Sequence, residues 1–113
     1  MSKLLAEWFW IDRWDGSSAP LLPMEAQGIY RAMLSQAWRR GARLPGDPEQ
    51  IRLLIRCRPA EWERSWPLVK RYWRLHELEF VNDTQLEIYA ETMRRHEIAS
   101  ERGRKGERNL PVH

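Results

Sequence analysis

Cysteine and long apolar runs are scarce in this sequence of 113 residues. The single Cys57 cannot form a disulfide within the chain, so a disulfide framework is excluded and stability must come from packing. The apolar runs span only a few residues, far short of the ~20 needed to cross a bilayer, so we expect no membrane partner. Residues 1–6 lead directly into Glu7 and a tryptophan cluster, without the apolar stretch of a secretory signal. We therefore expect a cytoplasmic protein.

The residue patterns that accompany catalysis are also missing. No metal-ligand spacing joins the three histidines and the cysteine, which are His76, His96, His113 and Cys57. No serine lies in a G-x-S-x-G setting, and no glycine-rich turn offers a phosphate cradle. Three aspartates, Asp12, Asp15 and Asp47, could serve a metal nuclease, but Asp47 is explained below as a helix cap. We expect a protein that is not an enzyme and has no metal, cofactor or small-molecule substrate.

Tryptophan, in contrast, is abundant. Each tryptophan can bury roughly 150–250 Å², so a few of them can organise the core of one domain. The seven are Trp8, Trp10, Trp14, Trp38, Trp62, Trp66 and Trp73. Trp14 adjoins a loop of glycine, serine and proline, which makes it the best candidate for an exposed docking aromatic.

The N-terminal part of the chain predicts a strand and then a helix. Residues 7–12 are rich in aromatic and β-branched side chains, as in a short strand. From Met24 to Arg40 the apolar residues recur with the period of one buried helical face, and Gly41 ends the pattern. This face holds Ala26, Tyr30, Met33, Leu34 and Ala37.

Two further helices are predicted after a turn. Asp47 and Pro48 supply an N-cap and a first-turn proline, and this short helix should end before Pro59. A third helix starts at Pro59 and buries a stripe made of Trp62, Trp66, Val69 and Trp73. Pro67 predicts a kink or break near Trp66. A helix followed by two short helices and a tight turn is a helix-turn-helix arrangement.

The remaining residues predict a small wing and a final helix. In residues 75–82, Leu78 and Phe80 alternate with glutamates as in a half-exposed strand, which could pair with the N-terminal strand. Thr84 and Glu87 form a capping box, and the helix that follows has an apolar stripe of Leu86, Ala90 and Met93. Residues 101–113 combine glycine with basic side chains and are expected to form a flexible basic tail. The predicted fold is mainly α with a small β-sheet, an α+β class.

Basic residues concentrate in two segments of the sequence. The first segment contains Arg52, Arg56, Arg58, Arg64, Lys70, Arg71 and Arg74, and the tail contains Arg102, Arg104, Lys105 and Arg108. If the tryptophan stripe faces inward, Arg64 and Arg71 point away from the core, with Lys70 and Arg74 on the flank. These groups could contact a phosphate backbone. The alternative is a solvated helix face and a solubilising terminus.

With these blocks in place, the chain resembles the YdaU-like domain of unknown function found in phage and prophage proteins. The resemblance implies a winged-helix-like domain over residues 1–100, a part in phage DNA replication or its regulation, and no catalytic residues. It rests on Asp12-x-Trp14, Leu22-Pro23-Met24-Glu25-x-x-Gly28-x-Tyr30, Trp38-x-x-Gly41-x-x-Leu44-Pro45-x-Asp47-Pro48, Trp62-x-x-x-Trp66-Pro67, Val81-Asn82 and Ser100-x-x-Gly103-Arg104-Lys105-Gly106.

Two functions from different classes follow. The first is a phage-derived protein that binds duplex DNA through Arg64, Arg71 and neighbouring basic groups, with the tail as an electrostatic arm. The second is a protein–protein adaptor or inhibitor that docks a host or phage replication protein. A continuous basic face favours the first, and an exposed apolar patch near Trp14 favours the second.

Overall fold

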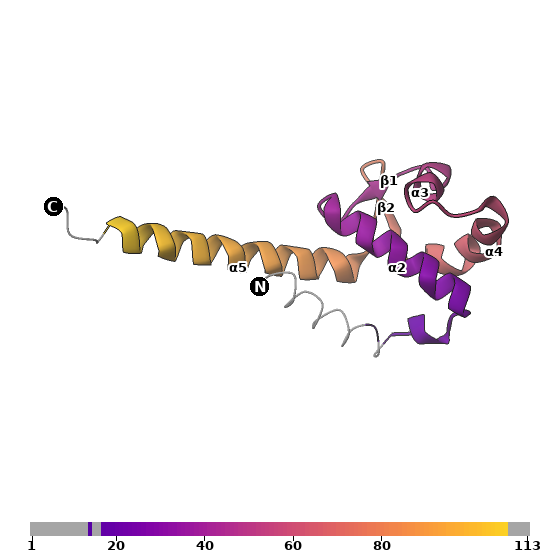
Figure 1. The fold of residues 1–113 in the computed structure, drawn as a ribbon, viewed down its shortest axis with the longest axis horizontal. Coiled ribbons are helices and arrows are strands. Elements are labelled where there is room, and N and C mark those ends of the chain that lie inside the picture. Colours follow the sequence, from indigo (N-terminus) through magenta and orange to yellow (C-terminus); the bar gives the residue numbers. More distant parts are fainter. Residues whose placement is uncertain (1–13, 15–16, 109–113) are drawn as a thin grey trace.

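The computed structural model describes Trp14 and residues 17–108 of the chain. The described part is mainly helical with a small antiparallel sheet, as predicted (Figure 1). Its elements are η1 (Ala19–Leu21), α2 (Met24–Arg39), β1 (Leu44–Pro45), α3 (Pro48–Leu54), α4 (Pro59–Val69), η2 (Lys70–Tyr72), β2 (Arg74–His76), β3 (Glu79–Val81) and α5 (Asp83–Arg108). The strand predicted at residues 7–12 lies outside the described residues.

Helix α2 supplies the centre of the core. All five residues of its predicted apolar face are buried, and Ile29 joins them. The helix ends at Arg39, and Gly41 follows with a φ of 76°, a left-handed conformation that suits glycine. The pattern of apolar residues therefore predicted both the helix and its buried face.

The tryptophan stripe also faces inward, although it is not carried by one helix. Trp62 and Trp73 are each 6% exposed, and half-buried Trp66 stacks on Trp62 at 5.0 Å between ring centroids. A kink or a break was predicted near Trp66; helix α4 continues through Pro67 to Val69, so the helix does not break there. The proline removes one backbone donor from the helix. Trp73 follows the 3-10 turn η2 in extended conformation and still reaches the core.

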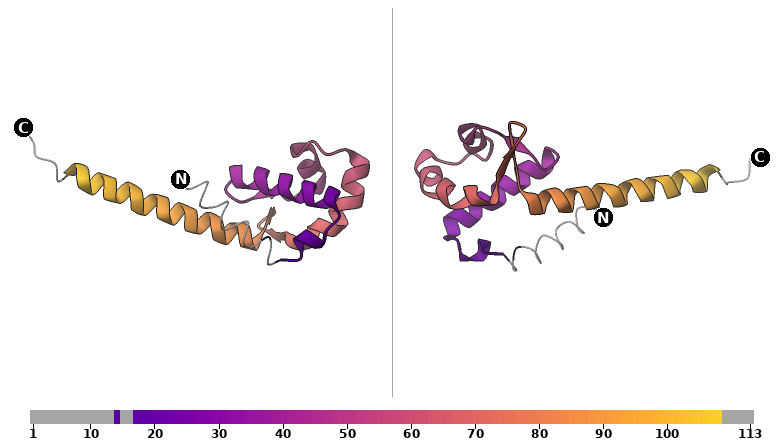
Figure 2. Two further views of the ribbon diagram at one scale, coloured as in Figure 1. Left: turned by 60° about the horizontal axis from the view of Figure 1, so that its bottom comes forward. Right: turned by 180° about the vertical axis from the view of Figure 1, so that it is seen from behind.

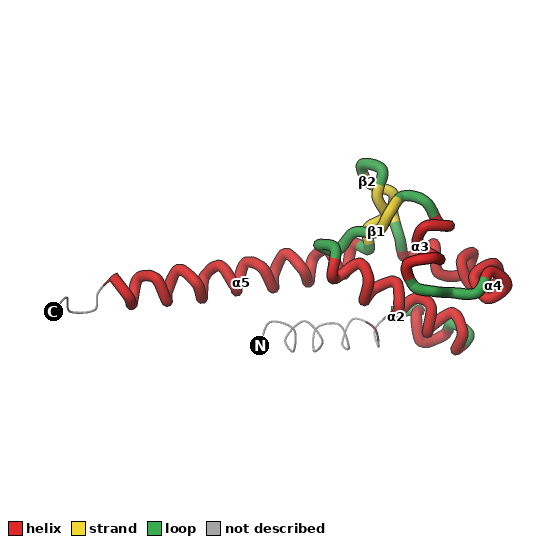
Figure 3. Tube along the Cα trace, turned by 45° about the horizontal axis from the view of Figure 1, so that its top comes forward, coloured by secondary structure: helices red, strands yellow, loops and turns green. Residues whose placement is uncertain are grey.

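The three strands form a sheet in the order β1-β3-β2, seen beside the helices in Figure 3. β3 pairs antiparallel with β1 and β2, with Leu44 opposite Phe80 and Arg74 opposite Val81. Both sides of β3 are therefore occupied. The predicted pairing of residues 75–82 with the N-terminal strand involves residues outside the described part of the chain and stays a prediction. Glu77 and Leu78 form the hairpin turn with φ of 49° and 69°. Leu78 is 85% exposed because it lies in this turn, which corrects the prediction that it faces the core.

Helix α5 begins two residues earlier than the predicted capping box indicates. Its N-cap is Asn82, whose Oδ1 accepts a hydrogen bond from the Gln85 amide at 2.9 Å, and not Thr84. The buried face is Gln85, Ile88 and Thr92. The predicted stripe of Leu86, Ala90 and Met93 is wrong, since Ala90 and Met93 are exposed and Leu86 is only half-buried.

The 26 residues of α5 span about 39 Å at the helical rise of 1.5 Å per residue. The helix leaves the core and projects away from it in every view (Figures 1 and 2). Residues 101–108, where a flexible tail was expected, are the last part of this helix, and residues 109–113 lie outside the described residues. In the part of the chain that the structure describes, no helix combines the length and apolarity needed to span a bilayer.

Gly46 connects β1 to α3 where the hairpin crosses it, and a larger residue there should destabilise the fold. A Cβ at Gly46 would lie 2.2 Å from the carbonyl oxygen of Leu78. We expect Gly46→Ala to lower the free energy of unfolding by about 1–3 kcal/mol through overpacking. Gly28→Ala is the matched control, because nothing lies within 4 Å of its added Cβ, and it should stabilise α2 by about 0.5–1 kcal/mol. Denaturant unfolding measures both, and a Gly46→Ala protein as stable as the wild type would show that the hairpin does not pack here.

Candidate nucleic-acid interface

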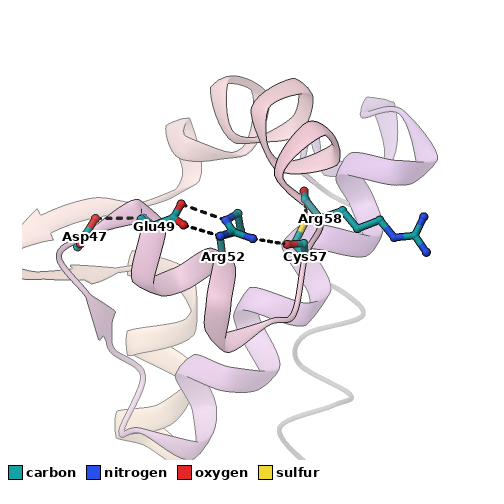
Figure 4. Close-up of polar contacts among 5 residues, drawn as sticks. All are labelled: Asp47, Glu49, Arg52, Cys57 and Arg58. Carbon is teal, nitrogen blue, oxygen red and sulfur yellow. Dashed lines mark hydrogen bonds and ion pairs between the residues drawn. The ribbon is translucent and has the colours of Figure 1, made fainter.

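The connection between α3 and α4 contains two exposed basic side chains of the predicted DNA-binding set, Arg56 and Arg58. Helix α3 starts as predicted, with Asp47 Oδ1 accepting from the Glu49 amide at 3.0 Å (Figure 4). Pro48 follows in the first turn, where its missing N–H is not needed. The start of α3 is therefore fixed by residues next to one another in the chain.

The Arg52 side chain stabilises the connection between α3 and α4 by hydrogen bonds. Its Nε donates to Glu49 at 3.0 Å and its Nη1 donates to the Cys57 carbonyl at 2.9 Å. The hydrogen bond from Arg52 lowers the pKa of Glu49, and the same bond raises the pKa of Arg52. Only 16% of the Arg52 side chain is exposed. Although it belongs to the predicted DNA-binding set, the structure uses its guanidinium to hold the turn.

The turn itself is closed by backbone bonds of the kind that end helices at a glycine. The Arg56 amide donates to the Leu53 carbonyl at 3.2 Å, and the Cys57 amide donates to the Arg52 carbonyl at 3.1 Å. Arg56 adopts a φ of 55° in this motif. The left-handed region costs a residue with a side chain roughly 1–2 kcal/mol, which glycine avoids. Among the described non-glycine residues, Ala42, Glu77 and Leu78 also have a positive φ.

Cys57 and Arg58 complete the connection. Burial raises the pKa of the Cys57 thiol, which donates weakly to the Arg58 carbonyl at 3.5 Å. Arg58 is the N-cap of α4, is exposed and makes no side-chain cap, and its guanidinium points away from the cluster (Figure 4). Among the described side chains, neither Arg56 nor Arg58 has an ion-pair partner. Two unpaired guanidiniums thus flank the start of α4.

The other predicted residues of this segment are exposed, but three of them have partners. Arg64 pairs with Glu25 at 3.1 Å, and Arg74 pairs with Asp83 at 2.8 Å. Arg71 donates to the Ser18 hydroxyl at 3.3 Å and its guanidinium lies over the Tyr72 ring. Lys70 is exposed in η2. Exposed ion pairs of this kind contribute little to stability and can be exchanged for another anion.

The basic residues of α5 lie elsewhere. Arg102 is exposed, and the backbone of Arg104, Lys105 and Arg108 belongs to the same helix. Figures 1 and 2 show that this half of α5 projects away from α4. The two predicted basic segments therefore do not form one continuous face.

Trp14, the predicted docking aromatic, is half-buried and packs against the core. Its ring lies 5.4 Å from that of Tyr30, and the Arg31 guanidinium lies over it at 4.7 Å.

Within the described residues, no three or more histidine, cysteine, aspartate or glutamate side chains are grouped to hold a metal ion. The positive φ of Arg56 could not be predicted, because no glycine marks the end of α3.

Comparisons with protein families, with curated proteins and with solved structures found no significant match to this chain. The resemblance to the YdaU-like domain therefore stays a prediction from the residues.

Proposed function

We propose that this protein is a non-enzymatic, winged-helix DNA-binding protein that contacts the phosphates of duplex DNA through the connection between α3 and α4. The observation that carries the proposal is the pair of exposed guanidiniums, Arg56 and Arg58, which have no ion-pair partner among the described side chains and flank the start of α4. In a helix-turn-helix protein the second helix enters the major groove with its N-terminal residues leading. In our proposal α4 would be this second helix.

The order of the elements supports this assignment. A helix, a short strand, two helices joined by a tight turn, and a hairpin follow one another, and the hairpin would serve as the wing. The strain at Arg56 adds to this support, because a glycine there would ease the backbone but remove a cation. Glu61 and Glu63 in α4 disfavour close approach of many phosphates, so we expect contacts at the turn to dominate.

The resemblance to phage and prophage domains adds a biological setting to the proposal. On that basis we propose a cytoplasmic role in phage DNA replication or its regulation. The basic residues of α5 would contact DNA only as a separate arm, since they project away from α4 (Figure 2).

Amide NMR spectra recorded while a short duplex is added test where DNA binds. We expect the largest shifts at residues 55–62, with smaller shifts at Lys70 and Arg71, and the same residues affected by a duplex of unrelated sequence. Shifts confined to α5 or to the hairpin would contradict the proposal. Raising the salt concentration should reverse the shifts, because phosphate contacts release counterions.

A second candidate function, docking of a host or phage replication protein, is supported by the hairpin. Leu75 and Leu78 are 56% and 85% exposed, and Glu77 and Glu79 neighbour them. Leucines beside glutamates suit a protein partner better than a phosphate backbone. Duplex-induced shifts that are absent from residues 55–62 would favour this candidate over DNA binding.

A further inference from the structure

A cavity of about 220 Å³ lies where η2 meets the start of α5, beside the central helix α2. Three aromatic residues line it, Trp14, Tyr30 and Tyr72, and the polar side chains of Asp83 and Thr84 complete part of its wall. The cavity is separate from the connection between α3 and α4, since η2 follows the opposite end of α4. None of its lining residues belongs to the predicted DNA-binding set.

The three aromatic rings that line the cavity already contact one another. Tyr30 lies 4.8 Å from Tyr72 with only 13° between the ring planes, and 5.4 Å from Trp14. A guanidinium covers each outer ring, Arg31 over Trp14 at 4.7 Å and Arg71 over Tyr72 at 5.2 Å. Both arginines are exposed, so a flat ring can take the place of a guanidinium at little cost.

The polar side of the cavity offers hydrogen-bond groups to the edge of such a ring. The Asp83 carboxylate accepts from Arg74 and is itself exposed, and the Thr84 hydroxyl has no hydrogen-bond partner among the described residues. A carboxylate can accept a hydrogen bond from an exocyclic amino group of a base. A hydroxyl can donate to an acceptor on the base edge or accept from a donor there.

Charge decides between the flat ligands that could enter. Arg31, Arg71 and Arg74 each contact a residue that lines the cavity, and Asp83 is the carboxylate among the described lining residues, so the described part of the rim is positive. A purely cationic ligand would be repelled, whereas a ring that bears a phosphate would gain charge-assisted bonds. Stacking on aromatic rings together with arginine contacts to phosphate is how proteins hold unpaired nucleotides.

We propose that this cavity binds one unpaired nucleotide, with its base against Trp14 and Tyr72 and its phosphate next to Arg71. The nucleotide can be part of a single strand or free in solution, and the chemistry of recognition is the same. This site lies apart from Arg56 and Arg58, although it shares Arg71 with the predicted DNA-binding set.

The test uses the full chain and a short fluorescein-labelled oligodeoxycytidylate, whose bases carry the exocyclic amino group that Asp83 can bind, with affinity measured by anisotropy. We expect Trp14→Ala and Tyr72→Leu each to weaken strand binding by roughly 5- to 100-fold, the range of one lost base stack. Tyr72→Phe is the matched control, because it keeps the ring and loses only the hydroxyl that bonds to Ser18, and it should bind like the wild type. Trp14→Ala should leave duplex affinity unchanged, which separates this site from the interface at α4.

Competition by deoxycytidine monophosphate distinguishes the two sources of the nucleotide. Displacement of the strand indicates a free nucleotide, and binding of the strand without displacement indicates a single strand; both support the proposal. Strand affinity that is the same in the wild type and in a folded Trp14→Ala protein, or the absence of binding by either probe, would overturn it. Thermal unfolding of each variant shows which of them are folded, so Trp14→Ala decides the matter if Tyr72→Leu fails to fold.

Discussion

Replacing Asn82 with alanine is expected to lower the free energy of unfolding by about 2–4 kcal/mol. Asn82 is 3% exposed and makes three hydrogen bonds from one side chain. Its Oδ1 caps α5 through the Gln85 amide, while its Nδ2 donates to the Tyr30 hydroxyl at 2.7 Å and to the Tyr72 carbonyl at 3.0 Å. The lost cap costs about 0.5–2 kcal/mol, and the buried polar groups left without a partner cost about 1–3 kcal/mol.

The Tyr30 hydroxyl is especially dependent on this contact. Burial raises the pKa of Tyr30 to about 12, so the hydroxyl stays protonated at neutral pH and cannot offset the loss by ionising. Denaturant unfolding followed by circular dichroism measures the effect. Thr84→Ala is the control, because Thr84 follows the cap and should change the free energy of unfolding by less than about 0.5 kcal/mol. Equal destabilisation by the two variants would mean that Asn82 is not the cap of α5.

The double variant Arg56→Gly with Arg58→Ala is expected to weaken duplex binding by about 10- to 100-fold near 0.1 M salt. Each guanidinium neutralises one phosphate in our proposal, and each such contact contributes roughly a factor of ten at this salt concentration. Glycine is chosen at position 56 because the φ of 55° suits it. The folded protein should therefore be at least as stable as the wild type, and lost affinity could not be ascribed to unfolding.

The charge-matched control is Arg39→Ala with Arg40→Ala. Both arginines are exposed at the end of α2, and their loss changes the net charge by the same two units. Anisotropy with a labelled duplex should show a change of less than about threefold for this control. If the two double variants weaken binding equally, net charge rather than the connection between α3 and α4 governs the interaction.

The helices of the core could be predicted because their signals are local. The cap of α3 needs only Asp47 and the amide of Glu49, and the buried side of α2 follows from the period of its apolar residues. The tryptophan stripe was predicted inward for the same reason. Each of these features depends on residues within a few positions of one another.

Features that depend on distant partners could not be predicted. Asn82 and Thr84 are both good capping residues, and the choice falls on Asn82 because its amide also bonds to Tyr30, which is 52 positions away. The pairing of Arg64 with Glu25 joins residues 39 positions apart. The hairpin turn at Glu77 and Leu78 has no glycine to mark it, so the exposure of Leu78 was missed.

The salt dependence of duplex affinity tests the central claim most directly. For the wild type, a plot of the logarithm of the association constant against the logarithm of salt concentration should fall linearly. For the Arg56→Gly and Arg58→Ala double variant the slope should be shallower by about two, one for each lost phosphate contact. Parallel plots for the two proteins, or a wild-type affinity that does not change with salt, would contradict the account.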